Sequence, residues 1–406
     1  MSQNDNDIVI VSAVRTPFSK FDSLMADIPS IDLGVMAIKE AISRAGVKPE
    51  EVDEVNYGSC IPAETALETD IPGRQATLLA GFPAESISLS LDRACCTSLT
   101  TLRLSIRAIR AGEADISLSV GSENMPRTPH LAPGLRTGKR LGPIQLIDNL
   151  FELGYGAKGF RPVAVDAGEV ALEHGVTREM QDAWALGSQE KYAKAFASGK
   201  IRVGEELMPV VIPRKKGDPI TIDKDESPRK TSMEALAKLK PVYGSPTVTA
   251  GNAPPISAGA SAILVMTRKK AKERGLTPLA TVIAAIASAT APREIAVIPA
   301  YSIRKALAKA GLKLDQMDII EINEAFAAMP LVSTKILADN DEKKWKELQA
   351  KTNVNGGAIA IGHPVGASAG RITMTMAYEL RRRGGGYGVA SICGGLAQGE
   401  AVIIKV

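Results

Sequence analysis

The pattern of apolar and polar positions repeats itself in two distant parts of the 406-residue chain. Residues 37–53 and 302–318 align without gaps. In each copy, apolar residues recur at helical spacing and are followed by a glycine stop and a short loop. A strand is predicted directly afterwards, at 54–57 in the first copy and 319–322 in the second. The sequence therefore predicts a duplicated unit of helices and strands.

A second pair of elements extends this duplication. A helix at 98–111, with apolar side chains on one face, leads to a strand at 116–120. Its counterpart is a helix at 368–380, which is followed by a glycine run and a strand at 389–392. Because helices and strands alternate in both halves, an α/β protein made of two similar units is the simplest interpretation.

The stretch between the halves has a different character. Residues 122–252 are rich in Pro, Gly and charge, with one clear helix at about 178–198, and are predicted to be a large insertion covering the site. A strand at 8–14 opens the first half, and a strand at 263–266 returns to it. The predicted domains are 1–121 together with 253–277, the inserted loop domain 122–252, and 278–406.

Composition narrows the class of protein. With 45% hydrophobic and 23% charged residues, the chain is expected to be a folded globular protein. No apolar run is long enough to span a bilayer, and the first residues lack signal-peptide features, so cytoplasmic residence without a membrane partner is expected. The net charge is +4, but the basic residues are not clustered as they are in nucleic-acid-binding proteins. This charge is compatible with binding an anionic small molecule. Four cysteines without zinc-site spacing predict free thiols and no metal.

Two cysteines and one histidine stand at turns beside predicted elements. Cys95 lies just before the helix at 98–111, where the free amides of the first turn would lower the pKa of its thiol. His363 lies in the glycine-rich turn 355–364, whose backbone can approach a ligand closely. Cys393 closes a predicted strand ahead of two glycines. A thiol, an imidazole and a second thiol suit the roles of nucleophile, base and acid.

Other interpretations stay open at this point. Cys95 could be a buried structural cysteine, and its neighbour Cys96 is predicted to serve packing alone. Asn323 and Glu324 follow a predicted strand, where such a pair can cap a helix or hold a water molecule. The duplication places one helix start at Cys95 and its equivalent after His363. A pseudo-twofold arrangement would bring these two positively polarised helix ends together in a cleft.

Taken together, four segments resemble the thiolase family in order and spacing along essentially the whole chain. They are residues 92–95, 323–326, 362–364 and 393–395, with further matching stretches at 11–17, 121–125, 247–252 and 356–360. The resemblance implies a duplicated thiolase-like fold with a layered α-β-α-β-α core. It also implies an acyltransferase that cleaves a 3-oxoacyl-CoA with CoA, or runs the reverse Claisen condensation.

The resemblance assigns roles to individual residues. Cys95 would take the acyl group as a thioester, His363 would help activate it, and Cys393 would shuttle a proton. One oxyanion site would use His363 with a water held by Asn323, and the other would use the backbone amides of Cys95 and Gly395. Coenzyme A is then a substrate or product, and no bound cofactor or metal is implied.

Binding and assembly are also implied by the resemblance. The insertion would bind CoA, with Arg229 at a phosphate and Ala250 and Gly251 in a matching loop. The segment 135–142 is similar to the loop by which some thiolase dimers pair into tetramers, so a homodimer or homotetramer is expected.

Two departures from the family pattern bear on the substrate. Pro254 and Pro255 stand where the family usually has Ser-Gly, and Val-Ala-Val-Asp-Ala-Gly at 163–168 replaces the usual Met-Gly-x-Thr-Ala-Glu acyl loop. We therefore expect a substrate other than plain acetoacetyl-CoA, with a branched, dicarboxylic or aromatic acyl part. The alternatives are an ordinary acetyl-CoA acetyltransferase and a thiolase subunit whose pocket a small accessory subunit completes.

Two more distant alternatives are less favoured. A decarboxylating ketoacyl synthase also fits residues 92–99, but such enzymes generally need a second His or an Asn where this chain has Cys393. An inert scaffold with the same fold would be expected to lose one of Cys95, His363 or Cys393, and all three are present.

Overall fold

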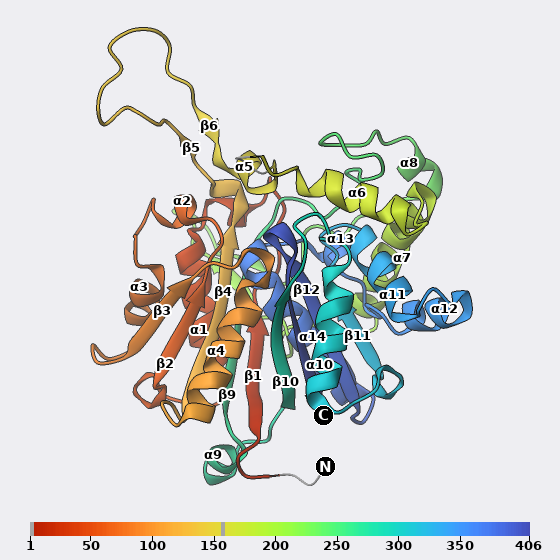
Figure 1. The fold of residues 1–406 in the computed structure, drawn as a ribbon. Coiled ribbons are helices and arrows are strands. Elements are labelled where there is room, and N and C mark those ends of the chain that lie inside the picture. Colours follow the sequence, from red (N-terminus) through yellow and green to blue (C-terminus); the bar gives the residue numbers. More distant parts are fainter. Residues whose placement is uncertain (1–3, 156–158) are drawn as a thin grey trace.

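A long, twisted sheet runs through the molecule, and the computed structural model describes it within residues 4–155 and 159–406. Its nine strands have the order β11-β12-β13-β10-β1-β9-β4-β2-β3 (Figure 1). The strands are β1 (Ile8–Arg15), β2 (Glu54–Gly58), β3 (Ile87–Leu91), β4 (Ile116–Asn124), β9 (Ala258–Thr267), β10 (Ala280–Ala289), β11 (Ile319–Ile322), β12 (Tyr387–Gly394) and β13 (Gln398–Lys405).

The sheet consists of two similar halves that meet at a narrow seam. Strands β1 and β10 pair only through Val9 with Thr281 and Ile10 with Ala280. On one side of the seam, β2 is parallel to β3 and β4, and β9 runs antiparallel to β4. On the other side, β11 is parallel to β12, and β13 runs antiparallel to β12. The predicted duplication is therefore visible in the strand directions.

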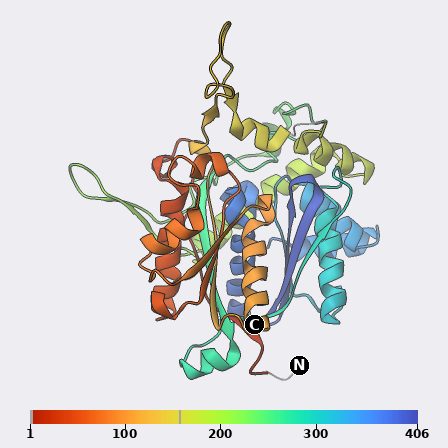
Figure 2. The same cartoon turned by 60° about the vertical axis from the view of Figure 1, so that its left-hand side comes forward.

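Helices cover both faces of each half-sheet and create five layers. Helices α4 (Thr97–Ala111) and α14 (Ser368–Arg382) lie between the half-sheets, which Figure 2 shows in side view. Helices α1 (Ser30–Arg44) and α3 (Pro72–Leu79) cover the outer face of the first half, and α10 (Ile298–Ala310) covers that of the second. This arrangement confirms the predicted α-β-α-β-α core.

Apolar side chains fill the spaces between these layers. The predicted apolar face of α4 is buried in the central layer, where Leu99, Leu102 and Ile106 are at most 2% exposed. They pack with Ile372 of α14 and with neighbouring strand residues in one hydrophobic cluster. Two further clusters lie beneath the outer helices. Each half thus has a core of its own, and the central layer joins the two.

The insertion crosses the top of the molecule in Figure 1 and holds more structure than the sequence predicted. The expected helix is present as α7 (Arg178–Ala197). The additional elements are the hairpins β5 (His130–Leu131) with β6 (Ile147–Asp148) and β7 (Val210–Ile212) with β8 (Ile220–Ile222), and the helices α5 (Asn149–Tyr155), α6 (Val163–Glu173) and α8 (Met233–Ala237). The limits of the three domains remain a prediction.

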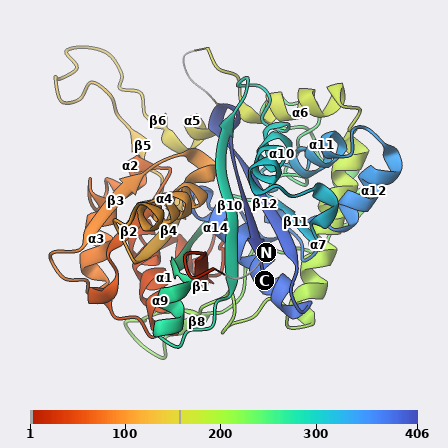
Figure 3. The ribbon, with the colours of Figure 1, turned by 60° about the horizontal axis from the view of Figure 1, so that its bottom comes forward.

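The second half carries two more helices on its outer side. Helix α11 (Ala328–Leu337) packs against α10, and α12 (Glu342–Ala350) packs against α11, as the view from below shows (Figure 3). Both lie between a predicted strand and the glycine-rich turn, in a stretch for which the sequence suggested no elements. In the described ranges, no helix combines the length and the hydropathy needed to cross a bilayer.

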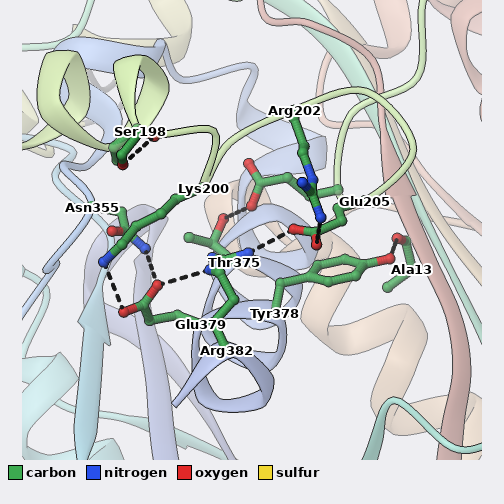
Figure 4. A network of polar contacts seen from close by, with 12 residues as sticks. Ala13, Ser198, Lys200, Arg202, Glu205, Asn355, Thr375, Tyr378, Glu379 and Arg382 are labelled. Carbon is green, nitrogen blue, oxygen red and sulfur yellow. Dashed lines mark hydrogen bonds and ion pairs between the residues drawn. The ribbon is translucent and has the colours of Figure 1, made fainter. Parts of the chain in front are cut away.

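A buried polar network ties the insertion to α14 (Figure 4). Glu379 of α14 accepts hydrogen bonds from Lys200 at 3.3 Å and from Asn355, the first residue of the glycine-rich turn, at 3.0 Å. Burial raises the pKa of Glu379, but hydrogen bonds from Asn355 and Arg383 and the charge of Lys200 outweigh it and lower the pKa to about 2. The ionised carboxylate thereby fixes one end of that turn.

Candidate active site

The turn that carries Cys95 is held by short-range hydrogen bonds. Asp92 accepts from the amide of Ala94 at 2.7 Å, and the Thr97 hydroxyl accepts from the amide of Arg93 at 2.8 Å. Ala94 has a φ of 46°, in the left-handed region that non-glycine residues rarely adopt. This tight turn places Cys95 immediately before α4, with its side chain partly exposed to solvent. The predicted position at a helix start is therefore present.

His363 is positioned by hydrogen bonds to its main chain and to its ring. Its amide donates to the Ser257 hydroxyl at 3.1 Å, and its Nδ1 lies 2.6 Å from the Ser368 hydroxyl. Ser368 in turn donates its only hydroxyl proton to the carbonyl of Pro364 at 2.8 Å. Its oxygen therefore accepts from Nδ1–H, and Nε2 is left as the unprotonated nitrogen.

The two halves bring the thiol and the imidazole together. Nε2 of His363 lies 3.3 Å from Sγ of Cys95, and Nδ2 of Asn323 lies 3.5 Å from the same nitrogen. Asn323 is itself held through its Oδ1, which accepts from Arg371 at 3.4 Å. The helix starts of α4 and α14 thus converge, as the duplication predicted. The unprotonated Nε2 faces the thiol and can accept its proton.

Cys393 reaches the same place from the end of β12. It is 1% exposed, and it lies close enough for an ionised Cys95 to raise the pKa of its thiol, although burial is the larger cause of that increase. The following glycines pack tightly against the Cys95 turn. A Cβ at Gly394 would lie 2.9 Å from Sγ of Cys96, and one at Gly395 would lie 3.4 Å from Cβ of Ala94. The backbone at Gly395 therefore borders the turn that carries Cys95.

The ionisation of the pair differs from the sequence-based expectation. Desolvation raises the pKa of Cys95 to about 12, and the hydrogen bond from the backbone amide at the helix start offsets only part of this. Burial, together with the charge of Arg371, lowers the pKa of His363 to about 3. The expected low pKa of the thiol was thus wrong for the resting protein. A neutral thiol faces a neutral imidazole.

Two buried carboxylates hold the site. Sequence reasoning gave Glu123 no role and considered Glu324 only as a helix cap or a water ligand. Glu123 is fully buried and accepts from the amides of Cys60 at 2.8 Å and Gly366 at 3.1 Å, one from each half. Burial raises the pKa of Glu123 to about 7, and hydrogen bonds from Cys60 and Ser59 limit the increase. Glu324 accepts from Trp184 of α7 at 2.8 Å and from the amide of Ile359 at 3.1 Å. Residues 121–125 belonged to a matching stretch, but only the folded structure gives Glu123 a role.

The residues suggested for CoA binding lie together in the insertion. The Arg229 guanidinium donates to the carbonyl of Ala250 at 2.8 Å, and its amide donates to the Gln189 side chain of α7 at 3.0 Å. Gly251 is buried, and its amide donates to Thr249 at 3.2 Å. The arrangement presents one exposed arginine on an ordered loop, which is the kind of group that contacts phosphate.

These features define an α/β protein with a duplicated, layered core and a cysteine–histidine pair between the halves. Residues 8–269 match the family model described as "Thiolase, N-terminal domain", and residues 276–406 match "Thiolase, C-terminal domain". The chain belongs to the thiolase family and is an acyltransferase. This favours the thiolase interpretation over the ketoacyl synthase.

Individual relatives cover nearly the whole chain. An acetyl-CoA acetyltransferase of Cupriavidus necator is 41% identical over 402 residues, which are 98% of this chain and 99% of that one. A probable acetyl-CoA acetyltransferase of Escherichia coli is 38% identical, with 98% and 99% covered. The crystal structure of human mitochondrial 3-ketoacyl-CoA thiolase is similar with a TM-score of 0.91 and 37% identity, covering 99% of both chains. A structure of that human enzyme in complex with CoA gives a TM-score of 0.90, 36% identity, and coverage of 99% and 98%.

Proposed function

We propose that this protein catalyses the thiolytic cleavage of a 3-oxoacyl-CoA, the reverse Claisen condensation, or both, through an acyl group carried on Cys95. The observation that carries the proposal is the 3.3 Å contact between Sγ of Cys95 and the unprotonated Nε2 of His363. An imidazole with its other nitrogen fixed by Ser368 can take a thiol proton without turning away.

The first half-reaction follows from this neutral pair. The thiol proton passes to Nε2 of His363 as Sγ of Cys95 attacks a carbonyl carbon. In thiolysis this is the 3-oxo carbon, and its bond to C2 breaks to release the acetyl-CoA enolate. In condensation it is the thioester carbon of the donor acyl-CoA, and its carbon–sulfur bond breaks to release CoA thiolate. The leaving group then receives a proton. Cys393, buried beside Cys95, is the proposed donor to that group and the acceptor in the reverse direction. Because each step returns its proton, the same residues serve both directions.

Two oxyanion sites complete the proposal. Asn323 lies 3.5 Å from His363 and is held by Arg371, so it can fix a water molecule that, with His363, binds one developing oxyanion. The backbone amides of Cys95 and Gly395 would bind the other. A Cβ added at Gly395 would be in van der Waals contact with Cβ of Ala94, at 3.4 Å, so the two backbone segments lie side by side, which supports this pairing.

Coenzyme A is the proposed acyl carrier and is a substrate or product. The exposed guanidinium of Arg229 is assigned to a CoA phosphate, and the backbone at Ala250 and Gly251 to the adjoining part of the molecule. The similar human thiolase has been solved in complex with CoA, which supports this class of ligand.

The acyl part is proposed to be larger than acetoacetyl. Residues 163–168, expected to be a loop lining the pocket, form the first turns of α6 (Val163–Glu173). In the other altered segment, the carbonyl of Pro255 accepts from the Ser257 hydroxyl, which also accepts from the amide of His363, so that segment is tied to the site. A rigid proline segment and a helical start differ from the Ser-Gly and Met-Gly of the family pattern. They would change the wall that contacts the acyl chain.

A second candidate, an ordinary acetyl-CoA acetyltransferase, is favoured by the names of relatives that are 41% and 38% identical. A thiolysis panel of linear, branched, dicarboxylic and aromatic 3-oxoacyl-CoA esters separates the two. We expect acetoacetyl-CoA to give a kcat/KM at least about tenfold below the best ester, which corresponds to about 1.4 kcal/mol. The highest kcat/KM for acetoacetyl-CoA would establish the second candidate instead.

Assembly is proposed to involve copies of this chain. Edge strand β3 presents Ile87, 68% exposed, and Leu89, 46% exposed, so an apolar edge is open to pairing with another copy. We propose a homodimer, or a homotetramer joined through the β5–β6 hairpin, that resides in the cytoplasm. Whether a small accessory subunit completes the pocket is tested by measuring the ester panel with and without a candidate subunit.

A further inference from the structure

A basic groove lies between the two halves, beside the helix that begins at the Cys95 turn. Helix α4, strand β10 and helix α10 surround a cavity of about 330 Å³, and Figure 1 shows these two helices flanking β10. The apolar part of its lining is Ile106 with residues 285–287. The remaining lining residues, which define the basic groove, are Arg103, Arg107, Arg110, Lys305 and Lys309.

The sequences of the two helices are unusual in charge. Helix α4 reads TSLTTLRLSIRAIRA and α10 reads IPAYSIRKALAKA, so neither contains an acidic residue. The basic residues that line the groove stand three or four positions apart on each helix and therefore share one face. By contrast, α12 reads EKKWKELQA and mixes both signs, as solvent-exposed helices commonly do. Ion pairs within the helices cannot balance the charge of the groove.

The surroundings neutralise little of this charge. Arg103 pairs with the buried Glu400 at 3.1 Å, and that carboxylate is also engaged by Arg93 and Thr100. Lys305 donates to the carbonyl of Ala287 at 3.1 Å, which is uncharged. Within the part of the chain that the structure describes, Arg107, Arg110 and Lys309 form no ion pair. Five cations and one carboxylate leave an excess of positive charge in a concave site.

Helix ends account for only part of the pattern. Arg110 and Lys309 lie in the last turns of α4 and α10, where a cation stabilises the negative end of the helix dipole. This explanation does not extend to Arg107 or Lys305, which lie earlier in their helices. It also does not explain why both helices turn their cations toward one cavity. A bound anion would relieve the repulsion among these groups.

We propose that the basic groove binds a small molecule bearing a diphosphate group, at a site separate from the Cys95 site. Guanidinium groups form paired hydrogen bonds with phosphate oxygens, and lysine ammonium groups add point charges. The cavity volume lies at the lower end of that found for small-molecule sites, and it suits a diphosphate better than a macromolecular surface.

The groove runs along α4 away from the Cys95 site. At 1.5 Å per helical residue, Arg103 is about 12 Å along the helix from Cys95, and Arg107 and Arg110 are about 20 Å from it. The bound diphosphate therefore does not contact the reacting thiol. The same chemistry is available from a free nucleoside diphosphate and from the nucleotide part of CoA.

Isothermal titration of the full-length protein with sodium pyrophosphate tests the site. We expect wild type to bind pyrophosphate, with an affinity that falls as salt is added. Arg107→Gln with Arg110→Gln should weaken binding tenfold or more, and Lys309→Gln, on the opposite wall, should weaken it as well. The matched control is Arg214→Gln with Lys216→Gln, two exposed residues in the insertion whose loss changes the net charge by the same amount. This control should bind like wild type.

Further titrations identify the source of the diphosphate. If ADP is the ligand, its affinity falls in the α4 double variant. If CoA is the ligand, the number of CoA molecules bound per chain falls from two to one in that variant. Thermal unfolding with and without pyrophosphate checks that each variant is folded, and only wild type and the control should gain stability from the ligand. The proposal is overturned by absence of pyrophosphate binding at millimolar concentration, by equal losses in the groove and control variants, or by unchanged binding in both groove variants.

Discussion

The two central helices occupy equivalent places in the duplicated fold, yet they have become different. Helix α14 is buried along most of its length, including Arg371, which is 0% exposed. Helix α4 turns its arginines toward the basic groove. The turn before α4 supplies a thiol, whereas the turn before α14 supplies an imidazole whose ring is fixed by the first residue of α14, Ser368. Duplication explains why the two turns meet, and divergence explains why one supplies a thiol and the other an imidazole.

The residues that support the two turns from behind differ as well. Behind His363, Asn323 is held by Arg371, which pairs with the buried Glu321 at 3.5 Å. Behind Cys95, the buried carboxylate of Glu123 accepts hydrogen bonds from backbone amides of both halves. The second half therefore orients the proposed base, His363, through contacts to its ring. The first half positions the proposed nucleophile, Cys95, through hydrogen bonds to the backbone around it. Substitutions at the Cys95 turn and at the His363 turn should therefore lower activity to different extents.

The largest effect is expected from the nucleophile. Cys95→Ser should lower thiolysis by about 10⁴-fold or more, because the hydroxyl is a far weaker nucleophile than the thiol at this position. Peptide mass mapping after incubation with acyl-CoA should place the acyl group on Cys95 in wild type. The control is Cys96→Ala, which should keep the label on Cys95. A label on Cys96, with Cys95→Ser still active, would reject the assignment.

A smaller loss is expected for the second thiol. Cys393→Ala should reduce thiolysis and condensation by about 10²-fold or more, the size expected for lost acid–base catalysis. Acylation of Cys95 should remain detectable in the half-reaction, although slower, because His363 can still take the proton of the attacking thiol. Turnover and the amount of acyl-enzyme are measured on the same samples. Near-normal turnover would show that Cys393 transfers no essential proton.

The duplicated fold and the meeting of the two turns could be predicted from local sequence patterns. The repeated helix–strand pairs have clear periodicity, and the meeting of Cys95 with His363 followed from the duplication. Strand β10, ATVIAAIASA, lacks clear alternation and was not predicted. The role of Glu123 depends on Gly366, 243 positions away. The pKa of Cys95 depends on desolvation by the folded surroundings, which no local pattern encodes.

A tenfold effect is expected from the group that orients the base. Ser368→Ala removes the acceptor 2.6 Å from Nδ1 of His363, so both the ring orientation and the tautomer lose support. We expect kcat to fall about tenfold with little change in KM, since the loss is one hydrogen bond to a reacting group. Thr in place of Ser368 keeps the hydroxyl and should restore most of the rate. Equal loss in both variants would indicate a packing defect instead.

The smallest effect concerns pH. The pKa of Cys95 is raised to about 12 and that of His363 is lowered to about 3, so both groups stay neutral from pH 5 to pH 9. We therefore expect the single-turnover rate of acylation, measured by release of CoA from acetyl-CoA, to change less than about threefold across this range. A thiolate–imidazolium pair would instead lose rate as acid protonates the thiolate.

Glu123 and Glu321 titrate within that range, because burial raises the pKa of Glu123 to about 7 and that of Glu321 to about 8. The folded protein then holds a proton on Glu123 that the unfolded chain has lost between about pH 4.5 and 7, so the contribution of this group to stability falls as pH rises through that interval. Any shallow step in the acylation rate near pH 7 should vanish in Glu123→Gln, which cannot titrate. A steep step that persists when Glu123→Gln and Glu321→Gln are combined would mean that the cysteine–histidine pair itself ionises. Cys95 and His363 would then carry opposite charges at rest, contrary to the neutral pair inferred from the structure.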